Sequence, residues 1–101
     1  MQKFKNINID VFKKISNYNN SIIIDIRDEE SFFKSHILNA KHISNNNMMT
    51  FIEKTDKNIN VLIYCYKGHS SQKIAHFLSD SGFTNVYSLI GGFNSWEDEI
   101  R

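Results

Sequence analysis

The sequence VLIYCYKGHS, residues 61–70, contains the signals that decide the fold. Its first four residues are apolar and rich in β-branched side chains, which is typical of a strand buried on both faces of a parallel sheet. A polar segment with one glycine follows. In residues 70–81, Ile74, Phe77 and Leu78 then recur at the i, i+3, i+4 spacing of an amphipathic helix, and a glycine ends the pattern. The stretch therefore predicts a strand, a short loop and a helix.

The same alternation of strand and helix patterns extends over the rest of the chain. Further strands are expected at residues 22–26, 85–89 and 41–43, with a short one near Phe4, and further helices at 9–15, 28–34, 48–54 and 93–100. Strands that alternate with helices predict an α/β fold with a parallel sheet and helices on both faces. In such folds ligands bind at the carboxyl ends of the strands.

Length and composition limit the function classes. The chain has 101 residues, 41% of them hydrophobic and 23% charged, so we expect one soluble domain over residues 1–101. A net charge of +1 offers no argument for binding nucleic acid or an anionic membrane. No stretch reaches the roughly 18–20 apolar residues of a membrane span, and the N-terminus lacks the apolar run of a secretion signal. The cytoplasm is therefore the expected location.

The one cysteine of the chain, Cys65, follows the strand at 61–64 and precedes the helix. Free N–H groups at a helix N-terminus attract negative charge, Gly68 allows the loop to curl, and Lys67 adds a positive charge. A thiolate is stabilised in such a place, so we expect the pKa of Cys65 to lie below about 8.5. The alternative is an inert buried cysteine at a strand end, which this combination of neighbours disfavours.

Three motifs, in this order and spacing, resemble the rhodanese superfamily over nearly the whole chain. The first lies in residues 24–43 and includes IDIR at 24–27, SF at 31–32, and two His-Ile pairs flanking Ala40. The second is the six-residue loop from Cys65 to Ser70, and the third is IGGFNSW at 90–96. The resemblance implies a doubly wound α/β fold with a five-stranded parallel sheet, thiosulfate:acceptor sulfur transfer, and Cys65 as the catalytic residue.

On this interpretation Cys65 carries sulfur as a persulfide, and the loop that follows binds the substrate and stabilises the persulfide. That loop comprises Tyr66, Lys67, Gly68, His69, Ser70 and Ser71. Lys67 is expected to hold the sulfonate end of thiosulfate. The Ser70 hydroxyl is expected either to donate to the sulfur or to cap the helix. The acceptor is a thiol or dithiol, with thioredoxin one candidate, and neither a cofactor nor a metal is needed.

Other polar residues are assigned supporting roles. Asp25 and Arg27, at the end of a strand, are expected to form an ion pair that shapes the active loop. His36 and His42 fit no zinc-ligand spacing and are expected to be structural. The glycine pair at 91–92 is expected to let its loop pass close to the active loop.

The chain departs from the usual family pattern at four positions. Ser35 and Asn39 stand where glycine is frequent, and Ser35 is therefore expected to strain a turn. Ile90 stands where a polar or charged residue is common. His69 changes the surface that the active loop presents to a substrate.

Several other classes compete with a sulfurtransferase. Phosphatases and arsenate reductases need a longer loop, often with Arg six positions after the cysteine, where this chain has Ser71. A non-catalytic rhodanese-like interaction module commonly lacks the cysteine, which is present here, and a sulfur-relay carrier remains open. A thioredoxin-like oxidoreductase requires a Cys-x-x-Cys motif, which a single cysteine cannot provide.

Overall fold

The computed structural model describes residues 4–100, which form one five-stranded, all-parallel sheet in the order β1-β5-β4-β2-β3. This confirms the α/β fold and the number of strands. The strands are β1 (Lys5–Ile7), β2 (Ser21–Asp25), β3 (Lys41–His42), β4 (Asn60–Tyr64) and β5 (Asn85–Leu89). The helices are α1 (Ile9–Ser16), α2 (Glu29–Lys34), α3 (Met48–Lys54), α4 (Ser70–Asp80) and α5 (Gly92–Ile100).

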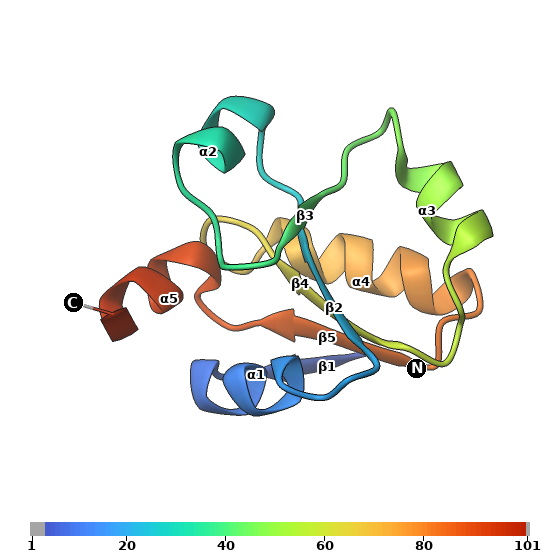
Figure 1. Cartoon of the computed structure of the whole chain (residues 1–101), viewed down its shortest axis with the longest axis horizontal. Coiled ribbons are helices and arrows are strands. Elements are labelled where there is room, and N and C mark those ends of the chain that lie inside the picture. The colour runs from blue at the N-terminus through green and yellow to red at the C-terminus, as the bar shows by residue number, and fades with distance from the viewer. Residues whose placement is uncertain (1–3, 101) are drawn as a thin grey trace.

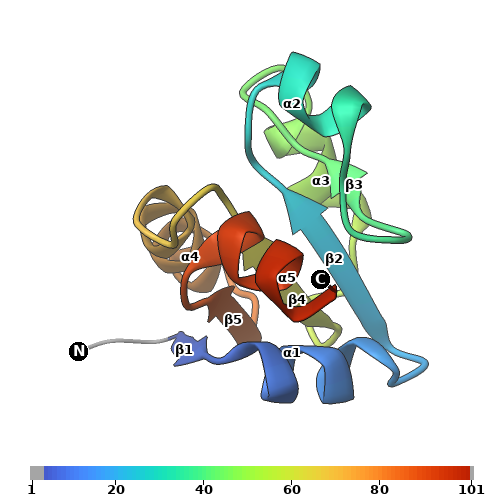
Figure 2. The same ribbon diagram turned by 90° about the vertical axis from the view of Figure 1, so that its left-hand side faces the viewer.

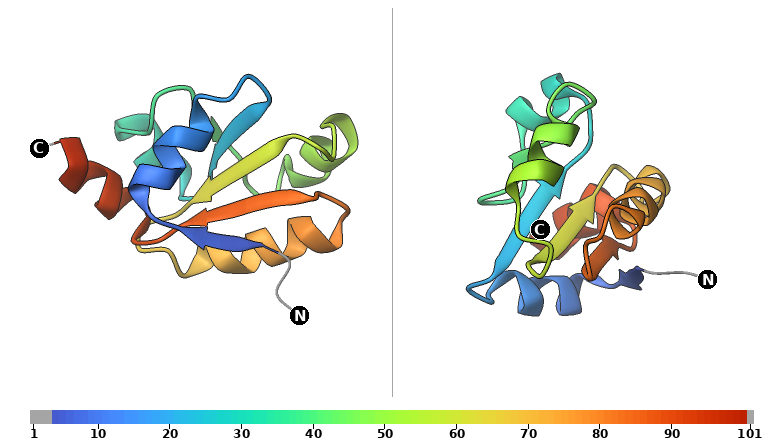
Figure 3. Two further views of the ribbon diagram at one scale, coloured as in Figure 1. Left: turned by 90° about the horizontal axis from the view of Figure 1, so that it is seen from below. Right: turned by 90° about the vertical axis from the view of Figure 1, so that its right-hand side faces the viewer.

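Helices cover both faces of the sheet, with α1 and α4 on opposite sides in the left view of Figure 3. Successive residues of a strand point to opposite faces, so each central strand contributes to two cores. Ile24 and Ile63 belong to the core under α3 and α4, whereas Ile23 and Leu62 belong to the core under α1 and α5. The continuous apolar runs of β2 and β4 follow from this burial on both faces.

Helix α4 buries Leu78 and partly buries Ile74, as its sequence pattern predicts, but it leaves Phe77 at the surface. Phe77 is 43% exposed, and the buried residues are Ser71, Ala75, Leu78 and Ser79. The expected apolar face was therefore wrong at Phe77. Small side chains allow α4 to lie close to the sheet, and the larger phenylalanine is left at the surface.

The turn between α2 and β3 shows why two departures from the family pattern are tolerated. Ser35 has a φ of −168°, which is extended backbone open to any residue, so the expectation of strain there was wrong. Asn39 has a φ of 70°, in the left-handed region that asparagine enters more readily than most residues. Asn39 can therefore replace glycine at this position.

The strand order places a topological switch point between β2 and β4. The chain leaves β2 toward β3 on one side and leaves β4 toward β5 on the other, so the two following loops diverge. Figure 1 shows these loops at the carboxyl ends of the strands, and Figure 2 views that end of the molecule directly. None of the helices within residues 4–100 is long and apolar enough to cross a lipid bilayer.

Candidate active site

Cys65 lies at this switch point, immediately after β4. Its side chain is almost fully buried, with 5% of its surface exposed, and it is a free thiol. A cavity of about 180 Å³ opens above it, lined by Cys65, Tyr66, Lys67, His69 and Ser70. The sulfur is thus enclosed by its own loop but borders a space that a small anion can enter.

Two backbone donors and one hydroxyl group surround the Cys65 sulfur. The hydroxyl oxygen accepts a hydrogen bond from the neutral thiol, and the hydroxyl can donate one to the thiolate. The backbone N–H groups of Gly68 and Ser71 lie 3.2 and 3.3 Å from Sγ, and the Ser71 hydroxyl lies 3.4 Å from it. The loop can close in this way because Gly68 adopts a φ of +95°, where a side chain would be strained. A Cβ atom at Gly68 would also lie only 3.0 Å from the backbone nitrogen of Gly91. The expected curl at Gly68 is therefore present.

The environment of Cys65 lowers its pKa, as expected for a reactive thiol. Burial acts in the opposite direction, because it disfavours the charged thiolate. Hydrogen bonds outweigh it: first from the Ser71 hydroxyl, then from the backbone N–H groups of Ser71, Gly68 and Lys67. Dipoles aimed at the sulfur therefore favour the thiolate.

The hydroxyl next to the sulfur belongs to Ser71 and not to Ser70. Among the described residues, the Ser70 hydroxyl neither bonds to Sγ nor caps α4, because the N-cap position is His69 and carries no side-chain cap. Both expected roles of the Ser70 hydroxyl were therefore wrong. Ser71 lies on the buried face of α4, and its Oγ also lies 2.7 Å from Oγ of Ser88, a β5 residue that the sequence analysis did not single out.

The glycine pair at 91–92 lets the N-terminus of α5 contact the active loop, as predicted. A Cβ atom at Gly92 would lie 2.5 Å from the carbonyl oxygen of Cys65, so only glycine fits without displacing backbone. The N–H of Phe93 donates to that same carbonyl at 2.7 Å, and the N–H of Asn94 donates to the carbonyl of Tyr66 at 3.2 Å. Helix α5 thereby fixes the backbone from which the Cys65 side chain projects.

Asp25 and Arg27 form the expected ion pair, and both are buried. Arg27 Nη2 lies 2.7 Å from Asp25 Oδ2 and also donates to the carbonyl of Ser35 at 2.6 Å. The guanidinium packs over the ring of Phe93 at 3.9 Å and over that of Tyr66 at 5.6 Å. Burial lowers the pKa of Arg27, but the hydrogen bonds and charge of Asp25 outweigh it and raise that pKa.

Tyr66 connects the active loop to the N-terminus of α2. Its hydroxyl group donates to the carboxylate of Asp28, the N-cap of α2, and is hydrogen-bonded to the Ser31 hydroxyl. The hydrogen bond from Tyr66 and those from Ser31 lower the pKa of Asp28 to about 2. The loops after β4 and β2 are therefore joined at the mouth of the cavity.

The cationic and imidazole side chains predicted for the loop lie at the surface. Lys67 and His69 are exposed and border both the cavity above Cys65 and a neighbouring one of about 310 Å³. His42, by contrast, bonds through Nε2 to the carbonyl of Arg27 at 2.6 Å, and His36 stacks on Phe32. Within residues 4–100 no three His, Cys, Asp or Glu side chains gather as metal ligands.

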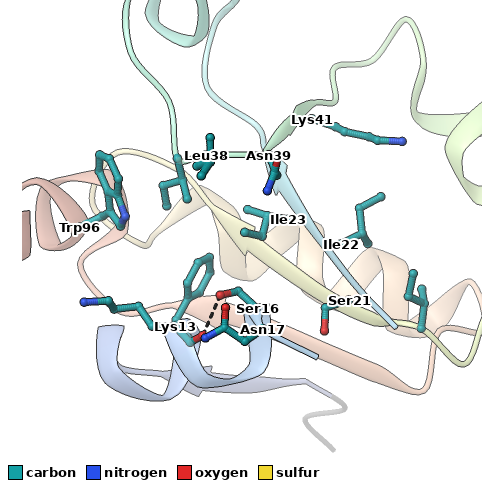
Figure 4. Close-up of a pocket in the computed structure, with 13 residues that line it drawn as sticks. Lys13, Ser16, Asn17, Ser21, Ile22, Ile23, Leu38, Asn39, Lys41 and Trp96 are labelled. Atoms are coloured by element: carbon teal, nitrogen blue, oxygen red, sulfur yellow. Dashed lines mark hydrogen bonds between the residues drawn. The ribbon is translucent and has the colours of Figure 1, made fainter. Parts of the chain in front are cut away.

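The largest cavity lies away from Cys65, between α1, α5 and the β2–β3 side of the sheet (Figure 4). It measures about 510 Å³, and its walls include Phe12, Ile23, Leu38 and Trp96. Its polar groups bond to nearby backbone: Ser16 Oγ to the carbonyl of Lys13 at 2.7 Å, and Ser21 Oγ to that of Ile15 at 2.7 Å. No residue of the active loop lines this cavity, so it is separate from the cavity at Cys65.

Comparisons with known proteins agree with this geometry. Thiosulfate sulfurtransferase GlpE of Coxiella burnetii is 49% identical over 76 residues, which cover 75% of this chain and 71% of that protein. Thiosulfate sulfurtransferase GlpE of Ectopseudomonas mendocina is 38% identical over 96 residues, covering 95% of this chain and 87% of that protein.

Solved structures show the same fold. A rhodanese-like domain protein from Staphylococcus aureus matches with a TM-score of 0.78 at 26% identity, over 92% of this chain and 91% of that one. The rhodanese-like domain of an Anabaena protein matches with a TM-score of 0.82 at 20% identity, over 98% and 76%. Residues 8–99 match the family described as the rhodanese-like domain. This chain therefore belongs to the rhodanese family.

Proposed function

We propose that this protein is a thiosulfate sulfurtransferase in which Cys65 carries the transferred sulfur as a persulfide. The observation that carries the proposal is the single cysteine of the chain, held at the switch point with N–H and O–H donors on its sulfur. The relatives named thiosulfate sulfurtransferase GlpE support the choice of thiosulfate as the donor.

In the first step the Cys65 thiolate attacks the outer sulfur of thiosulfate. A new S–S bond forms, the S–S bond of thiosulfate breaks, and sulfite leaves with the electron pair. No general base is needed, because the lowered pKa favours the thiolate in advance. Lys67 and His69, at the rim of the cavity, are the side chains that meet the sulfonate end.

In the second step an acceptor removes the outer sulfur. Cyanide or a thiolate attacks it, forms thiocyanate or a new persulfide, and returns the Cys65 thiolate. The N–H groups of the loop stabilise the anionic outer sulfur in the meantime. The proposed physiological acceptor is a thiol or dithiol, with thioredoxin one candidate. A phosphatase is disfavoured because position 71 is a serine whose hydroxyl pairs with Sγ, rather than an arginine.

The central intermediate can be observed directly. Reduced protein mixed with excess thiosulfate, without an acceptor, should gain the mass of one sulfur atom in intact-protein mass spectrometry. Because the chain has no second cysteine, the persulfide cannot collapse into an internal disulfide and should persist. Addition of cyanide should remove the added mass and release thiocyanate.

Cys65→Ser is the control, and it should show no added mass. An adduct that survives this substitution would place the sulfur elsewhere and overturn the assignment. Unmodified wild-type protein after prolonged incubation would instead favour the non-catalytic interaction module.

A further inference from the structure

Ser88 has no part in the mechanism above, yet it lies in the second layer around the reacting sulfur. Its Oγ lies 2.7 Å from Oγ of Ser71, which in turn lies 3.4 Å from Cys65 Sγ. Ser71 and Ser88 are fully buried, and Cys65 nearly so. The three side chains thus form one hydrogen-bonded series that runs from the sulfur into the interior of the protein.

Regular secondary structure holds the two serines of this series in place. Ser88 is paired with Ile63 of β4 and with Asn6 of β1, so it lies in the middle of a three-stranded ladder. Ser71 belongs to the first turn of α4, and its own N–H contacts the Cys65 sulfur. Both hydroxyl groups are buried away from bulk solvent, and the hydrogen bond to Ser71 satisfies the Ser88 hydroxyl.

The directions of the hydrogen bonds follow from the charge on the sulfur. A hydroxyl donates one hydrogen bond, and its oxygen can accept others. When Cys65 is a thiolate, Ser71 donates to Sγ, and the Ser88 hydroxyl is placed to donate to the Ser71 oxygen. When Cys65 is alkylated or carries an outer sulfur, the negative charge is gone from Sγ. Ser71 can then turn its proton toward Ser88.

We propose that Ser88 is a positioning residue for the Cys65 thiolate, acting through Ser71 by a paired reorientation of the two hydroxyl groups. In the thiolate state Ser88 donates to Ser71 and strengthens the Ser71 hydrogen bond to sulfur, because successive hydrogen bonds polarise one another. In the persulfide state the Ser88 oxygen accepts a hydrogen bond from the Ser71 hydroxyl. Each serine keeps its own proton, so the attack of the Cys65 thiolate on thiosulfate needs no base.

This inference rests on the proposed function only for its effect on catalysis, whereas its effect on the thiol can be measured without any sulfur transfer. The rate of alkylation by iodoacetamide as a function of pH gives the pKa of Cys65. Ser71→Ala should raise this pKa by about one to two units, the value of a hydrogen bond to a charged group. Ser88→Ala should raise it by about half a unit, since it removes only the polarisation of that bond.

The decisive measurement is a double-mutant cycle. If Ser88 acts through Ser71, Ser88→Ala should leave the pKa unchanged when Ser71 is already alanine. An equal shift in both backgrounds would mean that Ser88 acts by packing, and would overturn the proposal. Ser79→Ala, which removes another buried hydroxyl of α4 about two turns further on, is the matched control and should not move the pKa.

Kinetics separate the two chemical steps. At a pH below the thiol pKa, Ser88→Ala should slow formation of the persulfide from thiosulfate about threefold, because a half-unit rise in pKa lowers the thiolate fraction by that factor. At a pH well above the thiol pKa this loss should disappear, whereas the cyanide step should still be slowed, because Sγ leaves as a thiolate in that step. Ser88→Thr retains a hydroxyl and should restore the pKa toward the wild-type value. If the double-mutant cycle gives the expected pKa values but the protein has no sulfurtransferase activity, the proposed function is refuted and this inference is supported. If the protein transfers sulfur but Ser88→Ala does not change the pKa of Cys65, the proposed function is supported and this inference is refuted.

Discussion

The loop after β4 surrounds the Cys65 sulfur with N–H and O–H donors, whereas the neighbouring loop after β2 holds the buried Asp25–Arg27 pair. Both are polar sites at the carboxyl edge of one sheet. Arg27 is a full cation, but its charge is matched by Asp25 and covered by the ring of Phe93. The Cys65 sulfur is met by dipoles, and no cation within residues 4–100 is bonded to it.

This difference indicates that the two loops have separate roles: the loop after β4 carries the chemistry, and the loop after β2 supports the site. A fixed cation bonded to the sulfur would stabilise the thiolate so strongly that its nucleophilicity would fall, since a lower thiol pKa means a weaker nucleophile. Dipoles favour the anion more gently and can follow a charge that moves to the outer sulfur. The matched ion pair instead shapes the wall of the site, and the predictions below test this separation of chemistry from support.

Cys65→Ser should have the largest effect and should affect activity alone. We expect thiosulfate:cyanide sulfur transfer to fall at least about a thousandfold, because the covalent intermediate cannot form. The substitution is nearly isosteric, so the thermal melting temperature should stay close to that of the wild type. Substantial residual activity in a homogeneous preparation would show that Cys65 is not the nucleophile.

Asp25→Asn, in contrast to Cys65→Ser, should mainly reduce the stability of the protein. It leaves Arg27 buried without its counter-charge, which typically costs about 3–5 kcal/mol. Urea denaturation would measure the change in the free energy of unfolding. The control is Lys13→Ala, which breaks the exposed Lys13–Glu99 pair at 3.4 Å and should cost less than about 1 kcal/mol. Equal costs for the two variants would show that the buried pair is not the support that we infer.

Gly92→Ala should damage both properties, because α5 contacts the active loop at this residue. The new Cβ would meet the Cys65 carbonyl at 2.5 Å, so the loop or α5 must move, and misplaced catalytic groups can cost about a hundredfold in rate. Gly82→Ala is the matched control: its φ is also positive, at +109°, but its nearest neighbour is 3.9 Å away. It should lose some stability and keep its activity, measured as kcat/KM. If both variants kept full activity, the close approach at Gly92 would not matter for catalysis.

Lys67→Ala should have a smaller and salt-dependent effect. Lys67 is exposed at the rim of the cavity, so its attraction for a dianion acts through water. We expect the KM for thiosulfate to rise about three- to tenfold at low ionic strength and the difference to vanish near about 1 M salt. The exposed Lys41, distant in sequence from the active loop, provides the control Lys41→Ala. If neither Lys67→Ala nor added salt changes the KM for thiosulfate, Lys67 has no role in substrate binding.

The smallest expected effect concerns the contact between the two loops. Tyr66→Phe removes the hydroxyl that helps to lower the pKa of Asp28 to about 2, so this pKa should move up toward the ordinary value of about 3.9. Because the folded-state pKa is the lower one, this contact stabilises the protein above about pH 4 and is lost as the pH falls toward 2. NMR titration of the Asp28 carboxyl measures the change. An unchanged Asp28 titration would show that the hydrogen bond does not persist in solution.

Much of the site could be predicted from sequence because its parts are contiguous. A β-branched run, one cysteine, one glycine and a helical pattern determine a strand, a loop and a helix N-terminus within about twenty residues. Donors on the sulfur then follow from local backbone geometry. Pairing of Asp25 with Arg27 was also predictable, since the two residues lie only two positions apart.

The contributions of Ser71 and Ser88 could not be obtained in the same way. Position in the loop favours the Ser70 hydroxyl, but the rotation of α4 that buries Ala75 and Leu78 turns Ser71 toward the sulfur. Ser88 lies 23 residues from Cys65 in the sequence, and only the pairing of β5 with β4 brings it near. A serine between Tyr87 and Leu89 of this strand was the one available signal.

By itself, then, the sequence determined the type of fold, the place of Cys65 after a strand and the loop amides around it, because these depend on periodicity and on neighbours along the chain. The tertiary structure alone decided which serine contacts the sulfur, which residue supports that serine, and why Gly92 cannot carry a side chain. These depend on how α4, β5 and α5 pack against the loop. Packing sets contacts to within a few tenths of an ångström, a precision that sequence patterns do not encode.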